Sequence, residues 1–77
     1  MVGELVNGQY QRLQGALAEG WAVEQPVYAM NDPVRPKQIV YQFILWRDGK
    51  PLITTVEDSA EIRQFIEERQ LKLERLY

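Results

Sequence analysis

Cysteine and histidine are both absent from this 77-residue chain. Without cysteine no disulfide can hold the fold, and without either residue the usual protein ligands for zinc and iron are missing. A domain of this length buries only about 60% of the surface that its unfolded chain exposes. We therefore expect its stability to come from close packing or from association with a second copy.

The sequence also lacks a long apolar run and a strong excess of charge. Its longest apolar segment is far shorter than the roughly 18 residues that span a bilayer, and its N-terminal segment lacks the pattern of a secretion signal. Nine basic and eleven acidic side chains give a net charge of −2, which disfavours nucleic acid and anionic membranes as partners. We expect one folded cytoplasmic domain over residues 1–77 that makes no contact with membranes.

Residues that would indicate catalysis or ligand chemistry are scarce. Ser59 is the only serine, it has no histidine to activate it, and its position suits a helix cap better than a nucleophile. The glycines fit neither common phosphate-loop spacing. Asp32 and Asp48 each stand alone in a turn, so no carboxylate cage for a hard cation is visible. We expect a protein that is not an enzyme, with no catalytic residues, no metal ligands and no cofactor.

The N-terminal segment has the spacing of an amphipathic helix over residues 2–19. Its apolar positions fall on one stripe, and Gly20 follows as a C-terminal stop. The stripe consists of Val2, Val6, Tyr10, Leu13 and Leu17.

Three strands are predicted after this helix. Residues 21–30 form the first, and Pro26 in its middle removes a ladder donor, so this strand should be bulged there or lie at an edge. Residues 31–37, with two prolines and an Asn-Asp pair, form a turn-rich connector. Residues 38–46 form the second strand and residues 52–56 the third. The second is the most apolar and is expected at the centre of the sheet.

The Asp48-Gly49 pair predicts a tight hairpin between the second and third strands, because a type I′ turn needs positive φ at both positions. Such a loop places Leu45 opposite Leu52 and divides the strands into two faces. The first face has Tyr41, Phe43, Leu45, Leu52 and Val56, and we expect it to pack on the helices. The second face has Val40, Gln42, Ile44, Trp46, Ile53 and Thr55.

A second helix is expected to begin at Asp58 or Ser59, where residues 58–61 have the spacing of a capping box. Its apolar stripe is Ile62, Phe65, Ile66, Leu73 and Leu76. Arg69 falls in the middle of that stripe and Leu71 on the opposite side. The helix therefore either ends near Gln70 or continues past the edge of the sheet.

Together these elements predict an α+β fold, a three-stranded antiparallel meander in α-β-β-β-α order with both helices on one face. This order resembles the double-stranded RNA-binding domain in topology, a family that grips phosphate with lysines at the start of its second helix. In this chain the corresponding residues 57–61 read Glu-Asp-Ser-Ala-Glu, which would repel phosphate. The remaining candidates for nucleic-acid contact are the loop residues Arg35, Lys37, Arg47 and Lys50.

Two helices on one side of a sheet leave the second face of the sheet uncovered. We therefore predict a small protein-interaction module that forms a homodimer or binds another protein, since twofold dimers are the commonest oligomers. The predicted interface uses this exposed sheet face together with the C-terminal helix, and its residues are Val40, Ile44, Trp46, Ile53 and Leu71.

Three other interpretations stay open. The loop basic residues would serve a weak nucleic-acid binder. A small apolar ligand between the sheet and the helices would require a pocket next to Trp21, Tyr28 or Tyr41, where aromatic rings are available. Trp46 would also be explained if it only folded over a sheet edge and shielded the hairpin.

Overall fold

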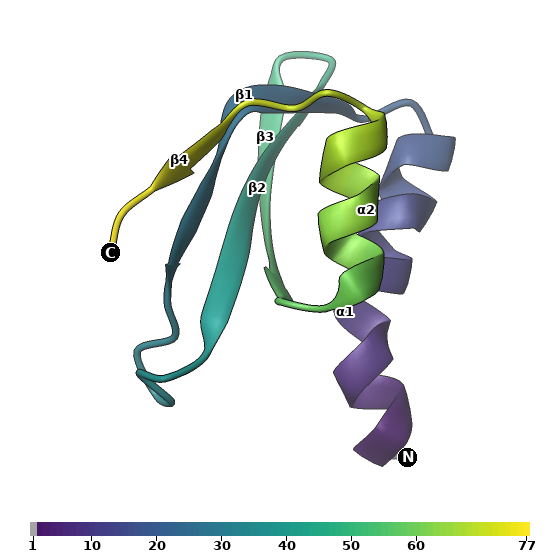
Figure 1. The fold of residues 1–77 in the computed structure, drawn as a ribbon. Helices are drawn as coiled ribbons and strands as arrows, with labels where there is room; N and C mark the ends of the chain where they lie inside the picture. The colour runs from purple at the N-terminus through teal and green to yellow at the C-terminus, as the bar shows by residue number, and fades with distance from the viewer. Residues whose placement is uncertain (1) are drawn as a thin grey trace.

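The computed structural model describes the backbone of residues 2–77 and the side chains of residues 9–77, so Val2 and Val6 of the predicted stripe lie outside the described side chains. The α+β class is confirmed, and Figure 1 shows both helices on the same side of the sheet. The elements are α1 (Val2–Ala18), β1 (Ala22–Asn31), β2 (Ile39–Arg47), β3 (Lys50–Glu57), α2 (Ala60–Glu68) and β4 (Leu73–Arg75).

The sheet has four strands in the order β3-β2-β1-β4. Strands β1, β2 and β3 form the predicted antiparallel meander with β2 inside the sheet. The prediction of three strands was incomplete, because β4 pairs parallel to β1 and makes the sheet mixed. The resulting α-β-β-β-α-β order also departs from the topology that resembled the RNA-binding family.

The hairpin between β2 and β3 has the predicted loop and register. Asp48 and Gly49 have φ values of 52° and 74°, the left-handed conformations that a two-residue loop of this kind requires. Leu45 pairs with Leu52 and Ile44 with Ile53. The two faces derived from the sequence are therefore those of the folded sheet.

The irregularity expected at Pro26 is present. The register of β1 against β2 shifts between Glu24 and Tyr28, whereas the alternative of an edge strand is wrong because β1 lies between β2 and β4. At this irregular segment β4 begins. The Gln25 side-chain Oε1 accepts a hydrogen bond from the backbone N–H of Lys72 at 2.9 Å, and the Val27 N–H donates to the Lys72 carbonyl at 2.8 Å.

Of the two alternatives for helix α2, an end near Gln70 is confirmed and a continuation to Leu76 is wrong. Gln70 adopts a φ of 54°, and the N–H groups of Gln70 and Leu71 donate to the carbonyls of Glu67 and Ile66, each at 3.0 Å. This is a Schellman arrangement, which satisfies the last helical carbonyls and redirects the chain. The helical stripe that included Leu73 and Leu76 was therefore wrong beyond Ile66, because the chain leaves the helix to pair with β1.

Both helices pack on the face predicted for them. One buried cluster contains Leu13 of α1, residues of α2 and inward-facing residues of the sheet, and Phe65 connects its parts: its ring centre lies 6.1 Å from that of Phe43 and 6.0 Å from that of Tyr10. The cluster consists of Leu13, Val27, Ala29, Tyr41, Phe43, Leu45, Val56, Ile62, Phe65 and Ile66.

Candidate functional site

We call the side of the sheet turned away from the helices the outer face, and its predicted interface residues differ widely in exposure. Val40 is only 4% exposed. Its neighbour on β3 is Glu57, and the connector residue Arg35 reaches Glu57 with an Nη2 to Oε1 distance of 3.0 Å. The connector therefore covers this end of the outer face, and Val40 does not belong to an open surface.

Leu71 also exposes too little of its side chain to form a large contact with a partner. It is half-buried and packs against the core of its own chain, because it follows the turn that ends α2. Three of the five predicted interface residues remain on the outer face outside the connector, and we call them the outer patch: Ile44, Trp46 and Ile53.

Within the outer patch, Ile44 is half-buried while Trp46 and Ile53 are 39% and 59% exposed. The indole Nε1 of Trp46 donates a hydrogen bond to Glu24 Oε1 at 2.7 Å. Since Glu24 lies on β1, the indole is anchored toward the interior of the sheet and does not fold over a sheet edge at the hairpin. Ile53 is the most exposed member of the patch.

Strand β3 carries a second exposed aliphatic residue, Leu52, which is 41% exposed. Successive residues of a strand point to opposite faces, so Leu52 lies on the helix side and Ile53 on the outer face. Leu52 was assigned from the sequence to the face that packs on the helices, and its exposure was not predicted. Its exposure follows from the position of β3 at the edge of the sheet.

The loop basic residues do not form one surface. Arg35 and Lys37 precede β2, whereas Arg47 is its last residue and Lys50 begins β3. The length of β2, nine residues, separates the two pairs by about 27 Å. Arg35 is paired with Glu57, and Arg47 Nε lies 3.7 Å from Asp48 Oδ2. These four residues therefore do not form a single basic patch for nucleic acid.

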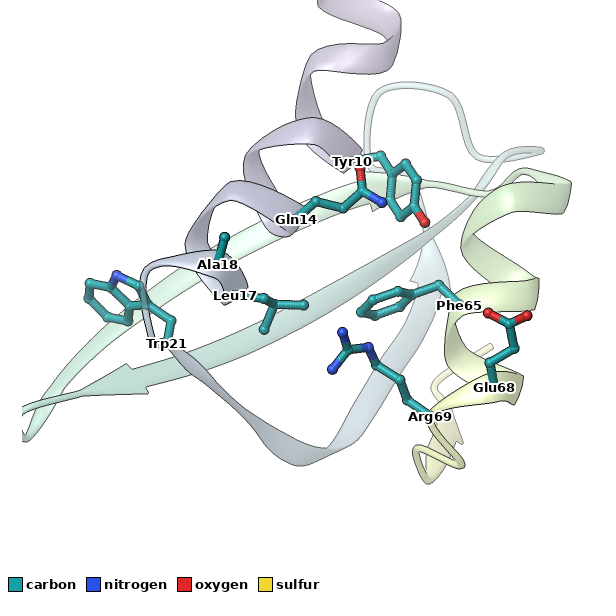
Figure 2. Close-up of a pocket in the computed structure, with 8 residues that line it drawn as sticks. All are labelled: Tyr10, Gln14, Leu17, Ala18, Trp21, Phe65, Glu68 and Arg69. Atoms are coloured by element: carbon teal, nitrogen blue, oxygen red, sulfur yellow. The ribbon is translucent and has the colours of Figure 1, made fainter.

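A cleft of about 510 Å³ lies between α1 and α2, with its lining residues shown in Figure 2. Arg69 enters this cleft, and its guanidinium carbon lies 4.8 Å from the centre of the Phe65 ring, a distance at which a cation is attracted to an aromatic face. This explains why an arginine falls in the apolar stripe of α2. The lining residues are Tyr10, Gln14, Leu17, Ala18, Trp21, Phe65, Glu68 and Arg69.

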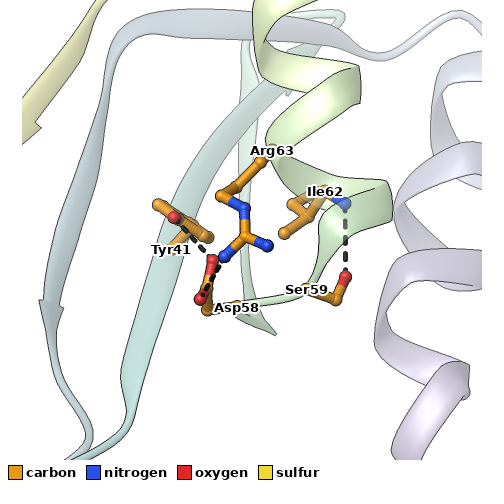
Figure 3. A network of polar contacts seen from close by, with 5 residues as sticks. All are labelled: Tyr41, Asp58, Ser59, Ile62 and Arg63. Atoms are coloured by element: carbon orange, nitrogen blue, oxygen red, sulfur yellow. Dashed lines mark hydrogen bonds and ion pairs between the residues drawn. The ribbon is translucent and has the colours of Figure 1, made fainter.

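A polar network joins β2 to the start of α2, as Figure 3 shows. The Tyr41 hydroxyl donates to Asp58 Oδ1 at 2.8 Å, and Arg63 Nη1 donates to Asp58 Oδ2 at 2.8 Å. Burial, reinforced by the hydrogen bond to Asp58 and by its charge, raises the pKa of Tyr41 to about 12. The Ser59 hydroxyl accepts from the Ile62 N–H at 3.3 Å, which confirms Ser59 as the helix cap.

This network has a structural role, because it fixes the start of α2 to β2. Tyr41 lies in the buried cluster, and Asp58 uses both carboxylate oxygens to bind groups of the same chain. The contacts of Asp58 with Tyr41 and Arg63 were not predicted from the sequence. The available signal was a residue with a polar tip on the core face, together with a carboxylate next to a helix cap.

Comparison of the chain with protein-family models, with curated proteins and with solved structures finds no match. Within the described chain no helix combines the length and the apolar character needed to cross a bilayer. The described side chains contain no group of three or more residues able to hold a metal ion.

Proposed function

We propose that this chain is a small non-enzymatic interaction module that forms a homodimer through the β3 side of its sheet. The observation that carries this proposal is the exposure of Ile53, which is 59%. Ile44 is its direct cross-strand neighbour, and Trp46 lies on the same face of β2. Contact of a second copy with β3 removes Ile53 from water, which is favourable in proportion to the area buried.

The charge pattern of β3 supports the same proposal. Residues 51–56 carry no charged side chain, whereas Lys50 and Glu57 flank them. The centres of protein interfaces are depleted of charge and their rims are polar. A contact centred on Ile53 and bordered by these two residues has that arrangement.

Ile53→Glu is expected to convert the dimer to a monomer, because a carboxylate placed in the contact would lose its hydration without gaining a partner. Sedimentation equilibrium at micromolar concentration measures the change, and circular dichroism establishes that the variant is folded. Ile53→Val should remain a dimer. Leu76→Glu, at a 55% exposed position that follows β4 on the opposite edge of the sheet, should also remain a dimer. A wild-type chain that sediments at the mass of one copy would contradict the proposal.

The cleft between α1 and α2 supports a second candidate function, the binding of a small aromatic molecule. Its volume of about 510 Å³ lies within the range of small-molecule sites. The prediction of an apolar-ligand site required a pocket next to Trp21, Tyr28 or Tyr41. Of these three residues, Trp21 lines the cleft. The cleft lies between the two helices, however, and not between the helices and the sheet.

Ala18→Trp should abolish such binding, because the indole would fill the space between the helices. The measurement is the change in amide chemical shifts on titration with 2-naphthoate, an aromatic carboxylate that suits both the ring of Phe65 and the charge of Arg69. Arg12→Trp adds the same side chain at an exposed position of α1 that does not line the cleft, and it should leave the titration unchanged. Wild-type shifts that stay constant at millimolar naphthoate would exclude this candidate.

A further inference from the structure

The backbone of β3 presents unused hydrogen-bonding groups at the edge of the sheet. In an antiparallel pair, successive residues of a strand alternate between bonding the neighbour and pointing away from it. The pairing of Arg47 with Lys50 closes the hairpin, so Lys50, Leu52, Thr54 and Val56 bond to β2. The Asp58 N–H continues this alternation by donating to the Ile39 carbonyl at 3.0 Å.

The residues between them direct their backbone groups outward. Within the part of the chain that the structure describes, the N–H and C=O groups of Ile53 and Thr55 have no hydrogen-bond partner, so they line the edge as open groups. Pro51 has no N–H and occupies an outward position, where a strand tolerates proline. The opposite edge of the sheet is β4, which has only three residues. Of the two edges, β3 is the one long enough to pair with another strand.

We propose that two copies of the chain join by antiparallel pairing of β3 with β3 about a twofold axis at Thr54, so that the two sheets become one. This inference rests on the proposed function, because it specifies how the homodimer forms. In this register Ile53 of each copy exchanges backbone hydrogen bonds with Thr55 of the other. Thr54 faces its own symmetry mate.

Exposure on both faces of β3 favours pairing along the edge over stacking of the two outer faces. Ile53 and Leu52 are 59% and 41% exposed and point to opposite sides of the sheet. Of these two side chains, stacked outer faces would bury only Ile53 and would leave Leu52 in water. A strand added beside β3 contacts both side chains, because cross-strand neighbours lie about 5 Å apart on each face.

The distribution of charge favours antiparallel over parallel pairing. Of the charged residues of β3 itself, Lys50 lies at the hairpin end and Glu57 at the other end. Antiparallel pairing about Thr54 brings the basic end of each copy toward the acidic end of the other. Parallel pairing would place like charges together, which is destabilising.

The ends of the strand limit the length of the new ladder. Gln9 and the connector residues Asp32 to Arg35 line a cleft with Thr55 and Glu57, so they flank the end of β3 that precedes α2. Thr55 itself borders this cleft, so the shared ladder ends there and, by the twofold symmetry, comprises residues 53–55, which contain no charge.

Thr54→Cys tests this geometry directly, because the chain contains no other cysteine. Opposed residues that do not bond through their backbones have Cα atoms about 4.5 Å apart, within the range of a disulfide. We expect mild oxidation to link Thr54→Cys chains at least tenfold faster than Ile44→Cys chains. The latter carry their cysteine on β2, where only stacked outer faces would bring the two copies together.

Hydrogen exchange of the unmodified chain provides a second measurement, which is needed if Thr54→Cys fails to fold. Raising the protein concentration should slow exchange of the Ile53 and Thr55 amides at least tenfold relative to the Thr54 amide, which already bonds to β2. Edge pairing would be overturned if the chain sediments as a dimer but exchange of the Ile53 and Thr55 amides does not slow with concentration relative to the Thr54 amide. Faster disulfide linkage of Ile44→Cys than of Thr54→Cys would also overturn it. Either result would leave self-association standing. A monomeric wild-type chain would overturn both.

Discussion

Phe43→Ala is expected to lower the free energy of unfolding by about 3–5 kcal/mol, the range measured for removing a buried phenylalanine ring. Phe43 is fully buried, and its ring centre lies 6.1 Å from that of Phe65 with the planes at 68°. A domain of this length has roughly 4–12 kcal/mol of stability in total. The substitution should therefore remove a large share of it.

Urea unfolding followed by circular dichroism measures this loss. All variants should be compared at one protein concentration, because self-association makes apparent stability depend on concentration. Val34→Ala is the matched control, since it removes methyl groups at a position that is 84% exposed and should change stability by less than about 0.5 kcal/mol. A cost below about 1 kcal/mol for Phe43→Ala would show that the sheet and α2 are not joined through this ring.

The sequence predicted the parts of the fold that depend on local rules. Asp48-Gly49 defined a two-residue loop, and strict alternation then assigned each residue of β2 and β3 to a face. Both were confirmed because a hairpin is encoded by neighbouring residues. Ser59 was recognised as a helix cap for the same reason.

Strand β4 was missed because its signal was ambiguous. Leu73 and Leu76 continue the helical spacing of Ile62 and Ile66, and a strand of three exposed residues shows no alternation of its own. The decisive event is the left-handed conformation of Gln70. Glycine is the usual residue at that position and would have indicated the end of the helix.

The candidate site was predicted less completely than the fold. The burial of Val40 depends on Arg35 meeting Glu57, 22 positions later in the chain, and no local pattern reports such a contact. The cleft depends on how α1 and α2 lie relative to each other. The exposure of Ile53 was foreseeable, because the hairpin register alone placed it on the face opposite the helices.

Tyr41→Phe is expected to reverse its effect on stability between neutral and strongly alkaline pH. Below pH 10 the wild-type chain should be more stable by about 1 kcal/mol, the usual contribution of one hydrogen bond, because its hydroxyl bonds to Asp58. The pKa of Tyr41 is raised from 10.0 to about 12 in the folded chain. Between these values the unfolded chain releases this proton more readily than the folded chain, so rising pH favours unfolding.

The full shift corresponds to about 2–3 kcal/mol, which exceeds the benefit of the hydrogen bond, so Tyr41→Phe should become the more stable protein as pH approaches 12. The quantity to measure is the difference in urea unfolding free energy between the two proteins from pH 8 to pH 12, since groups common to both cancel. Arg63 opposes the shift whereas Asp58 and Tyr77 increase it. Asp58→Asn, which removes the carboxylate charge, should therefore weaken the reversal. If the difference in unfolding free energy between wild type and Tyr41→Phe stayed constant from pH 8 to pH 12, Tyr41 would ionise in the folded chain as easily as in the unfolded one.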